Sequence, residues 1–378
     1  MDEGEAGGAP LGICDTKEYV MSRYHEDRAS HFYRECHLQD VTVLKDSTGI
    51  EDEVHHVFRS GVMHGQPAFV ASVGQARLWG KHGAVITPDH RLLADVSWDY
   101  RGNDGLVRGW GHNAFREWVP HPLRFLPGTT ALLTFVWSWN YFHWMFDVLP
   151  RVDLIRRADQ DVDRYAISRY GMPYQRETLN LMGIPSDRIY EAGDDFHAEA
   201  ERLIVPSFVR PVEDWPSRYP RWTAEFLRRE FLYDRHVAVS PEYERIFVSR
   251  SKAQRRRMLN EDEIRLVLEE RGFRTVILEE LPFDEQIRIF ASAKAVVAPH
   301  GAGLANLVFC PPGTQVVELF SPGYLWNYFA HICHQVGLGH YYLIGEYSVS
   351  QGPGAWEGLS DFAADPAKLR RLLDKAGI

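Results

Sequence analysis

The chain has 378 residues, of which 45% are hydrophobic, 13% aromatic and 25% charged. This balance is typical of globular proteins with buried cores, so it excludes a wholly disordered chain, and the length predicts more than one domain. The formal net charge is −10. Because a duplex-binding protein needs a surplus of Lys and Arg to displace counterions, we expect no nucleic acid partner.

The four cysteines are scattered and include no Cys-x-x-Cys pair, so neither a disulfide framework nor a zinc knuckle is predicted. The acidic start MDEGEAGGAP has neither the basic residues nor the apolar run of a secretory signal. No stretch reaches the roughly 18 apolar residues of a membrane span. We therefore expect a protein of the cytoplasm, free or peripheral at the inner face of the membrane, with no integral membrane segment.

The first half of the chain predicts a β-rich segment followed by an α/β unit. Residues 69–98 show apolar alternation broken by Gly and Pro-Asp turns, which is typical of short strands. Beyond them, the pattern predicts strands at 131–137, 164–168 and 202–208, and helices at 141–158 and 174–184. Strands that alternate with helices imply right-handed crossovers and a parallel sheet.

A proline-punctuated stretch at 209–219 predicts a linker, and a second alternation follows a helix at 223–233. The predicted strands are 245–250, 273–280, 295–299 and 314–320, and the predicted helices are 261–272, 282–293, 326–337 and 365–377. The sequence thus predicts two α/β domains, residues 1–220 and residues 221–378, the first opening with the β-rich segment.

The segment AVVAPHGAGLANLVF (295–309) joins a buried-type strand to a short helix through a glycine-rich turn. The residues of interest are His300, Gly301, Ala302, Gly303 and Asn306. Glycine lets backbone N–H groups approach a ligand closely, and a helix N-terminus carries partial positive charge, so this turn indicates a phosphate or diphosphate site at the carboxyl edge of a parallel sheet. The alternative is a tight turn that merely requires glycine. The turn is neither a G-x-G-x-x-G motif nor a P-loop.

A cluster of cations lies at the end of the predicted strand that opens the second domain. Six cations and no acid occur in residues 245–257: Arg245, Arg250, Lys252, Arg255, Arg256 and Arg257. The position favours anion binding, since the carboxyl end of that strand lies near the ligand crevice of a doubly wound sheet. Planar guanidinium groups suit phosphate oxygens, and Arg250 and Arg257 are better candidates than the middle arginines. The alternative is a solvated loop whose arginines pair with the acidic residues 261–263.

The positions of three polar residues in the predicted elements indicate two further candidate sites. Glu318 ends a predicted strand beside the glycine-rich turn, where a carboxylate could accept hydrogen bonds from ribose hydroxyls or simply be exposed. His143 and Asp147 lie four residues apart among aromatic side chains in WNYFHWMFDVLPR (139–151), so a helix would place both on one face. An aromatic wall with few polar groups suits a sugar, and either residue could take a proton from a hydroxyl. The alternative is a core helix with a structural hydrogen bond.

Two patterns with metal-ligand spacing do not predict metal sites. The Asp-x-Asp of residues 159–163 precedes a strand instead of following one, so it is more typical of a helix end. His331 and His334 have ligand spacing but no Glu in metalloprotease register. The sequence also has no Gly-x-Ser-x-Gly elbow, so a hydrolase is not indicated.

Three ordered segments together resemble glycosyltransferase family 61. They are NYFHWMFDVLPR (140–151), FVSRSKAQRRRMLNEDEI (247–264) and FDEQIRIFASAKAVVAPHGAGLANLVFCPPGTQVVELF (283–320), and residues 76–97 resemble the family's lead-in. The resemblance implies a GT-B fold, in which two Rossmann-like lobes face a cleft, and an inverting reaction without an obligatory metal. It also implies that the C-terminal lobe binds a nucleotide sugar.

The resemblance assigns roles to the candidate residues. It implies donor binding by Arg250, Lys252, Arg257, His300, Gly301, Ala302, Gly303, Asn306 and Glu318. Asp147 is the first candidate for the catalytic base and His143 the second, because the motif would face the cleft from the acceptor lobe, and the choice stays open. Asn140, Tyr141 and Trp144 are expected on the acceptor side.

The predicted function is therefore an inverting, metal-independent glycosyltransferase that moves a sugar from a nucleoside-diphosphate sugar, a UDP-sugar first, to the hydroxyl of a glycan or other acceptor. No cofactor beyond this co-substrate is expected. The absence of an anchor before the domain favours a bacterial setting, in polysaccharide or glycoconjugate synthesis. Two alternatives stay open, a nucleotide-sugar epimerase or hydrolase on the same fold, and a non-catalytic sugar-nucleotide-binding relative.

Overall fold

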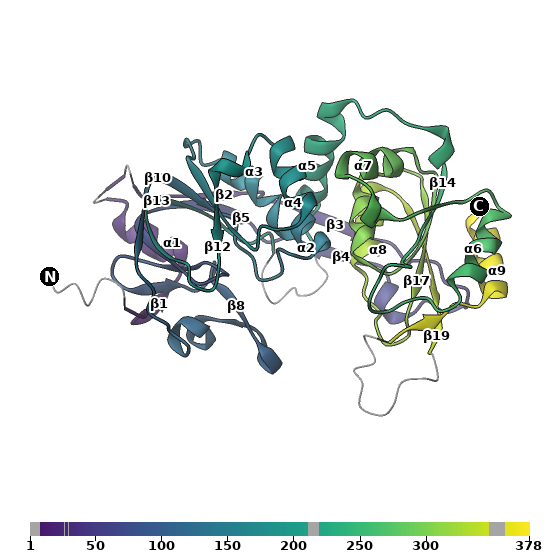
Figure 1. Cartoon of the computed structure of the whole chain (residues 1–378), viewed down its shortest axis with the longest axis horizontal. Coiled ribbons are helices and arrows are strands. Elements are labelled where there is room, and N and C mark those ends of the chain that lie inside the picture. Colours follow the sequence, from purple (N-terminus) through teal and green to yellow (C-terminus); the bar gives the residue numbers. More distant parts are fainter. Residues whose placement is uncertain (1–7, 26, 29, 211–218, 348–359) are drawn as a thin grey trace. The chain divides into compact units, whose positions relative to one another are not determined.

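The computed structural model describes residues 8–378 except for residues 26, 29, 211–218 and 348–359 (Figure 1). Its contacts divide the chain into unit 1, Met1–Asp40 with Gln66–Pro211, and unit 2, Val41–Gly65 with Val212–Ile378. The sequence-based division at residue 220 assigned residues 41–65 to the first domain, whereas the contacts group them with unit 2. Most of the predicted linker at 209–219 lies outside the described residues.

The segment 41–65 joins unit 2 through a two-stranded sheet. Its strands β3 (Val41–Leu44) and β4 (Gly61–His64) pair with each other, and β3 contacts helix α8 (Tyr328–Val336). The backbone of Thr48 also exchanges hydrogen bonds with the strand that begins at Gly339. The local sequence of residues 41–65 does not show which unit these two strands join, because that choice depends on contacts with residues far away in the chain.

Unit 1 is built on a nine-stranded mixed sheet, drawn in purple to teal in Figure 1. Its strands are β1 (Gly12–Cys14), β2 (Phe32–Cys36), β5 (Ala68–Trp79), β6 (Ala84–Ile86), β7 (Arg91–Leu93), β10 (Arg124–Leu132), β11 (Arg164–Ser168), β12 (Ile189–Ala192) and β13 (His197–Pro206). The order is β1-β7-β6-β5-β13-β10-β11-β12, with β2 beside β5. Strands β13, β10, β11 and β12 are parallel, and β13 pairs antiparallel with β5.

The parallel part of this sheet confirms the predicted strand–helix alternation, and the strands from residue 68 onward confirm the β-rich opening. The helices of unit 1 are α1 (Thr16–Arg23), α2 (Tyr141–His143), α3 (Arg151–Arg156) and α4 (Pro173–Leu181). A π-helix, residues 144–148, joins α2 to α3, and Leu149 N donates to Trp144 O at 3.0 Å. The helix predicted at 141–158 is therefore present in three pieces, interrupted at Pro150, which has no N–H to donate. The strand predicted at 131–137 ends at Leu132.

Unit 2 contains a five-stranded parallel sheet in the order β15-β14-β16-β17-β18. The strands are β14 (Arg245–Val248), β15 (Arg274–Val276), β16 (Ala295–Pro299), β17 (Gln315–Phe320) and β18 (Gly339–Ile344). Numbered along the chain this order is 2-1-3-4-5, a doubly wound arrangement that reverses direction between β14 and β16. Ligands of such sheets bind beyond the carboxyl ends of the strands at this reversal.

Helices cover both faces of this sheet (Figure 1). They are α5 (Arg221–Phe231), α6 (Glu261–Glu269), α7 (Phe283–Ser292), α8, α9 (Pro366–Ala376) and the 3₁₀-helix η11 (Ala302–Phe309). Apolar residues of α6 and α9 pack with the sheet in one cluster, while Phe231, Phe283 and Phe309 meet edge to face in another, with ring centroids 5.1–6.3 Å apart. Coverage on both sides explains why all five residues of β16 are buried.

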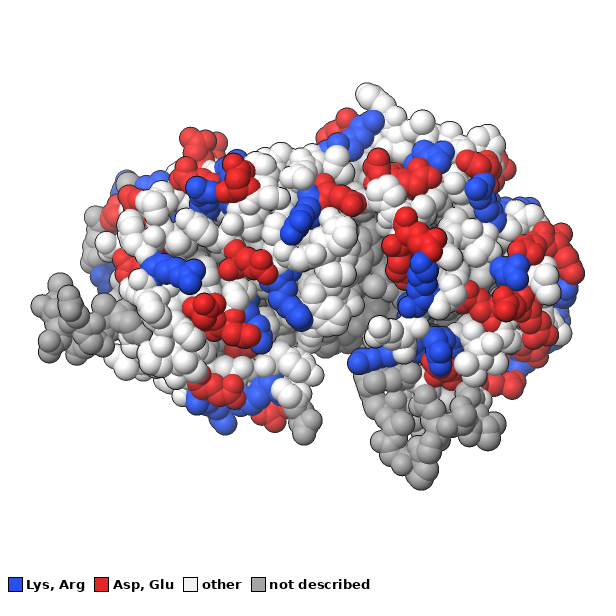
Figure 2. All heavy atoms as spheres, viewed as in Figure 1, with Lys and Arg blue, Asp and Glu red and all other residues white. Residues whose placement is uncertain are grey.

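The surface carries charges of both signs. Figure 2 shows Lys and Arg side chains interspersed with Asp and Glu side chains over the face in view. Among the helices of the described residues, none combines the length and the apolar character needed to cross a membrane.

Candidate functional site

The first candidate site lies where β14 and β16 end, at the reversal of the sheet of unit 2. Gly301 follows β16 in an extended conformation, and a Cβ on it would lie 1.9 Å from Nη1 of Arg250. A Cβ on Gly303 would lie 2.8 Å from Cδ1 of Leu278. A Cβ at either position would therefore force the neighbouring side chain to shift, and the absence of one at Gly301 lets the Arg250 guanidinium lie directly against the backbone of the turn.

Two arginines of this site have buried donors that no described residue accepts. Within the described residues, the Nε atoms of Arg250 and Arg256 are buried without a hydrogen-bond partner. Burial, and then the charge of Arg256, lowers the pKa of Arg250. The guanidinium carbon of Arg256 lies 3.9 Å from the centroid of the Tyr324 ring, and the Arg256 backbone has φ 53°. Unsatisfied buried donors are costly, and guanidinium groups match phosphate oxygens, so this pair is suited to an anion.

His300 belongs to a buried hydrogen-bonded chain in unit 2. Its Nδ1 lies 2.5 Å from Oε1 of Glu318, whose Oε2 lies 2.9 Å from Nε2 of His340, and Nδ1 of His340 lies 2.9 Å from Oγ of Ser47. Burial lowers the pKa of His300 and lowers that of His340 to about 3, and it raises the pKa of Glu318. The expected contact of Glu318 with ribose does not fit this geometry, because the side chain is 0% exposed and both oxygens bind histidines. Glu318 instead positions His300.

Two of the predicted donor-binding cations have acidic partners. Lys252 forms an ion pair with Glu280. Arg257 binds Asp361 through Nε at 3.0 Å and through Nη2 at 2.7 Å. The preference for Arg257 over the middle arginines therefore does not fit the structure, since Arg256 and not Arg257 lies with Arg250.

The two remaining predicted donor residues lie in η11. Ala302 is its first residue, at the end where helix N–H groups point outward. Asn306 is 0% exposed and donates from Nδ2 to Oε1 of Gln286 at 2.9 Å, which ties η11 to α7. A direct contact of Asn306 with a nucleotide does not fit this burial.

The second candidate site, in unit 1, joins His143 to Asp147. Nδ1 of His143 lies 2.7 Å from Oδ2 of Asp147, which confirms that the two residues share one helix face. Nε of Arg210 lies 3.4 Å from Oδ1 of Asp147, and the two side chains are 1% and 3% exposed. The sequence pattern does not indicate a role for Arg210. This residue lies four positions after the end of β13, at the start of the predicted linker, where no site was expected.

Arg151 holds this site to the sheet. It is 0% exposed and donates to the carbonyl oxygens of Leu132 and Thr134, at the end of β10, and of Pro206, at the end of β13. Burial lowers the pKa of Arg151 to about 9, although the charge of Asp147 opposes this shift. The site therefore lies at the carboxyl ends of two parallel strands that are distant in sequence.

His143 is more accessible than its carboxylate partner. The side chain of His143 is 14% exposed and that of Asp147 3%. The imidazole lies in a cluster of rings, with centroid distances of 5.3 Å to Trp137, 5.4 Å to Phe142 and 5.9 Å to Phe135. Because Nδ1–H donates to the Asp147 carboxylate, the lone pair of the neutral ring is on Nε2. In this arrangement a carboxylate orients a histidine whose other ring nitrogen is able to accept a proton.

The predicted acceptor-side residues have structural roles. Oδ1 of Asn140 caps α2 by accepting from the backbone N–H groups of Phe142 and His143 at 3.0 and 3.4 Å. Tyr141 packs edge to face on Tyr174, with centroids 5.0 Å apart. Trp144 is 0% exposed and donates from Nε1 to Thr178 at 2.9 Å, so an acceptor contact with its ring does not fit the structure.

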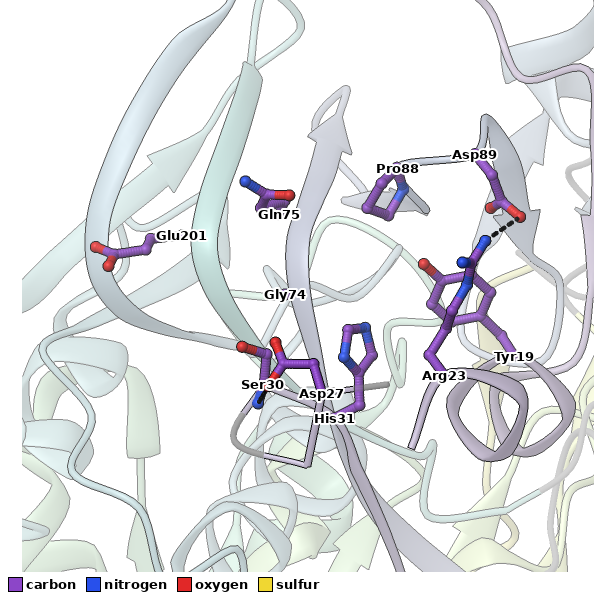
Figure 3. Close-up of a pocket in the computed structure, with 10 residues that line it drawn as sticks. All are labelled: Tyr19, Arg23, Asp27, Ser30, His31, Gly74, Gln75, Pro88, Asp89 and Glu201. Atoms are coloured by element: carbon purple, nitrogen blue, oxygen red, sulfur yellow. Dashed lines mark hydrogen bonds and ion pairs between the residues drawn. The ribbon is translucent and has the colours of Figure 1, made fainter. Parts of the chain in front are cut away.

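Unit 1 also has cavities away from these residues. One of about 590 Å³ lies between α1, β5 and β13 and is lined by Tyr19, Arg23, His31 and Asp89 among others (Figure 3). Arg23 and Asp89 form an ion pair there at 3.6 Å. None of the residues predicted from the sequence lines this cavity. A second cavity, of about 550 Å³, is lined by Trp137, whose ring contacts that of His143, although His143 is not among the lining residues.

The fold and the two sites define an α/β protein with two buried arginine N–H groups at the sheet reversal of one unit and a histidine–carboxylate pair in the other. The family model described as glycosyltransferase 61 matches residues 141–317, which include His143 and Asp147 of one site and Arg250, Arg256 and His300 of the other, whereas Glu318 lies just beyond them. This match confirms the resemblance to glycosyltransferase family 61 that the sequence motifs indicate, over residues 141–317.

Named relatives agree with this assignment. A beta-1,2-xylosyltransferase of Oryza sativa subsp. japonica is 36% identical over 77 residues, which are 20% of this chain and 13% of that protein. The protein O-linked-mannose beta-1,4-N-acetylglucosaminyltransferase 2 of Homo sapiens is 39% identical over 87 residues, 22% of this chain and 14% of that protein. Its counterpart in Danio rerio is 45% identical over 71 residues, 18% of this chain and 12% of that protein. The matches thus span about one seventh of these relatives' lengths.

Proposed function

We propose that the protein is an inverting glycosyltransferase of GT-B type that transfers a sugar from a nucleoside-diphosphate sugar to a hydroxyl of a glycan. The observation that carries the proposal is the pair of unsatisfied, buried guanidinium donors of Arg250 and Arg256 at the reversal of a parallel sheet. The family match over residues 141–317 supports the reaction class. Donor and acceptor functions are divided between unit 2 and unit 1.

In this proposal the arginines stabilise the leaving group. When the bond between the anomeric carbon and the diphosphate breaks, its electron pair stays on the nucleoside diphosphate. Arg250, Arg256 and the N-terminus of η11 supply positive charge where this negative charge develops, so the reaction is proposed not to need a metal. The neutral, buried His300 is held beside them by Glu318 and provides a polar contact without adding charge.

The acceptor is activated in unit 1. Nε2 of His143 takes the proton of the acceptor hydroxyl, whose oxygen attacks the anomeric carbon from the face opposite the diphosphate, and the configuration inverts. Asp147 orients the imidazole and stabilises the imidazolium that forms. This reverses the order of the two candidates given by sequence, because Asp147 is enclosed by His143 and Arg210 while His143 retains exposed surface.

The test is a transfer assay with purified protein and EDTA. UDP-xylose and UDP-N-acetylglucosamine come first, because the named relatives transfer xylose and N-acetylglucosamine; GDP- and dTDP-sugars follow. The acceptors are p-nitrophenyl glycosides of xylose, mannose and N-acetylglucosamine. We expect release of nucleoside diphosphate that depends on the acceptor, and a product whose anomeric configuration, measured by NMR, is inverted.

Two results would contradict the proposal. Release of free sugar at the same rate with and without acceptor would indicate a nucleotide-sugar hydrolase. Conversion of the donor into its epimer would indicate an epimerase. The setting, glycoconjugate or polysaccharide synthesis in the cytoplasm of a bacterium, stays a prediction of the sequence.

A further inference from the structure

The cavity lined by Trp137 lies at the carboxyl edge of the parallel strands of unit 1. Its lining comes from the segments that follow β10, β11 and β12, together with the turn after β5 and the strand β8 (Trp98–Arg101). This is the edge at which α/β sheets bind ligands. The cavity measures about 550 Å³, and a neighbouring cavity of about 290 Å³ shares Lys81, His82, Tyr100 and Asp194 with it. The two together offer room for more than one sugar ring.

Exposed aromatic rings form part of the lining. Trp139 is 46% exposed and Tyr100 45%, values that are high for side chains of this size. Tyr100 packs edge to face on Trp137, with centroids 5.9 Å apart, and Trp137 in turn lies 5.3 Å from the ring of His143. Tyr174 donates from its hydroxyl to the carbonyl of Trp139 at 2.6 Å, which fixes the backbone that carries the exposed indole. Rings of this kind stack on the apolar faces of pyranoses.

The charged groups of the cavity are balanced. Lys81 and Arg169 oppose Glu191 and Asp194 among the lining residues. Lys81 Nζ lies 2.7 Å from Asp194 Oδ1, and this hydrogen bond lowers the pKa of Asp194. Glu191 accepts from the backbone N–H of Tyr170 at 3.2 Å. The smaller cavity adds Asp99 and Glu117 but no further Lys or Arg. A site with donors and acceptors matches hydroxyl groups, whereas a phosphorylated or sulfated ligand would require a surplus of cations, which these cavities do not have.

A buried carboxylate supports the cavity wall. Asp99 Oδ1 lies 2.5 Å from Nδ1 of His82, and its Oδ2 lies 3.8 Å from Nε2 of His112. Asp99 also accepts from the backbone N–H of Tyr100 at 2.7 Å. These contacts fix the imidazole of His82 and the strand that carries Tyr100, two residues that line both cavities, and Asp99 and His112 themselves line the smaller one.

We infer that these joined cavities form the binding site for a neutral oligosaccharide acceptor, with Trp139 and Tyr100 stacking on sugar rings and the Lys81–Asp194 pair binding their hydroxyls. The inference rests on the proposed function and deepens it by naming the acceptor class. The chain of rings from Tyr100 through Trp137 to His143 links the site to the proposed base, so the reacting hydroxyl belongs to the sugar nearest Trp137.

The test measures glycan binding separately from donor binding. Full-length wild type, Trp139→Ala, Asp194→Asn and the control Trp110→Ala are applied to immobilised neutral, sialylated and sulfated glycans. Trp110 is also an exposed tryptophan of unit 1, 60% exposed, and packs on Phe115 away from the cavity lining. Binding of UDP, by thermal shift, is recorded for each variant. We expect neutral glycans to bind wild type and Trp110→Ala, and to bind Trp139→Ala at least about tenfold more weakly.

The outcomes separate the inference from the proposed function. Equal glycan binding by wild type and Trp139→Ala, no glycan binding by wild type, or a preference for sulfated or sialylated glycans would overturn the inference. Glycan binding that depends on Trp139 in a protein that binds no nucleotide would support the saccharide site and contradict the transferase. Asp194→Asn keeps the shape of the side chain, so weaker binding by this variant reports the lost charge pair and not a change of fold.

Discussion

The two sites differ in how their charged groups are satisfied. In unit 1, the carboxylate of Asp147 is enclosed by His143 and Arg210, and Arg151 is bound to three carbonyl oxygens. In unit 2, no described carboxylate forms an ion pair with Arg250 or Arg256, and their Nε–H groups, like that of Arg151 in unit 1, are buried without a partner among the described residues. Charged groups that are paired within the protein, as in unit 1, position neighbouring side chains. Buried cations without a carboxylate partner, as in unit 2, are suited to bind an anionic ligand. This difference supports the proposed division, in which unit 1 transfers the proton and unit 2 binds the diphosphate.

The largest effect is expected at His143. Replacing it in His143→Ala removes the proposed base, so kcat for sugar transfer should fall by about a thousandfold. Asp147→Asn removes only the orienting carboxylate and should lower kcat by about a hundredfold, with a changed pH profile. Steady-state kinetics across pH 5 to 9 measure both, and the affinity for UDP should stay unchanged. A greater loss from Asp147→Asn than from His143→Ala would restore Asp147 as the base.

The next effect is expected at Arg250. Arg250→Ala removes a partly buried cation from the leaving group, so kcat/KM for the donor should fall by about a hundredfold. Arg255→Ala is the matched control, because Arg255 is an exposed arginine of the same loop and gives only its carbonyl to Arg250. That variant should stay within about twofold of wild type. Equal losses in both variants would mean that the loop acts through its net charge alone.

A smaller effect is expected at Glu318. In Glu318→Gln, one of the two oxygens that accept from His300 and His340 becomes a donor, so His300 loses its fixed orientation. The KM for the donor should rise by about tenfold with little change in kcat. Glu280→Gln, which changes the exposed partner of Lys252, is the control and should leave KM within about twofold. If KM is unchanged in Glu318→Gln, the buried chain is purely structural.

The smallest effect concerns stability in unit 1. Burial lowers the pKa of His112 to about 4, although the charge of Asp99 opposes this shift. The unfolded chain therefore binds a proton that the folded chain does not, and stability should fall by about 1.4 kcal/mol per pH unit as the pH drops from about 6.5 to 4. His112→Asn keeps an acceptor for the N–H of Ala114, which His112 now accepts at 3.0 Å, and should flatten this slope. Urea unfolding at pH 7, 6 and 5 measures it, and parallel slopes would contradict this account.

Local patterns in the sequence predicted most of the elements but fewer of the contacts. The parallel strands β11 and β16 are present at their predicted residues, since a short apolar run between turn signals specifies a buried strand. The bond between His143 and Asp147 followed from helical spacing. What could not be predicted depends on distant partners: the ring of Tyr324 that holds Arg256, and the strand end that brings Arg210 to Asp147.

The glycines of the turn show the same limit. Their spacing indicated a close approach to the backbone at Gly301, and the structure shows that the approaching group is the guanidinium of Arg250. The tight-turn interpretation and the phosphate-site interpretation are therefore compatible. The close packing at Gly301 also positions Arg250, the cation proposed to bind phosphate. A sequence pattern shows that space is needed but not which side chain occupies it.

The central claim, that the cations of unit 2 bind the diphosphate independently of unit 1, is tested most directly by calorimetric titration of UDP and, in turn, GDP and dTDP in EDTA. Wild type and His143→Ala should bind one of these nucleotides with equal affinity, and Arg250→Ala should bind it about a hundredfold more weakly. Failure of wild type to bind any of them, or equal binding by Arg250→Ala, would contradict the account.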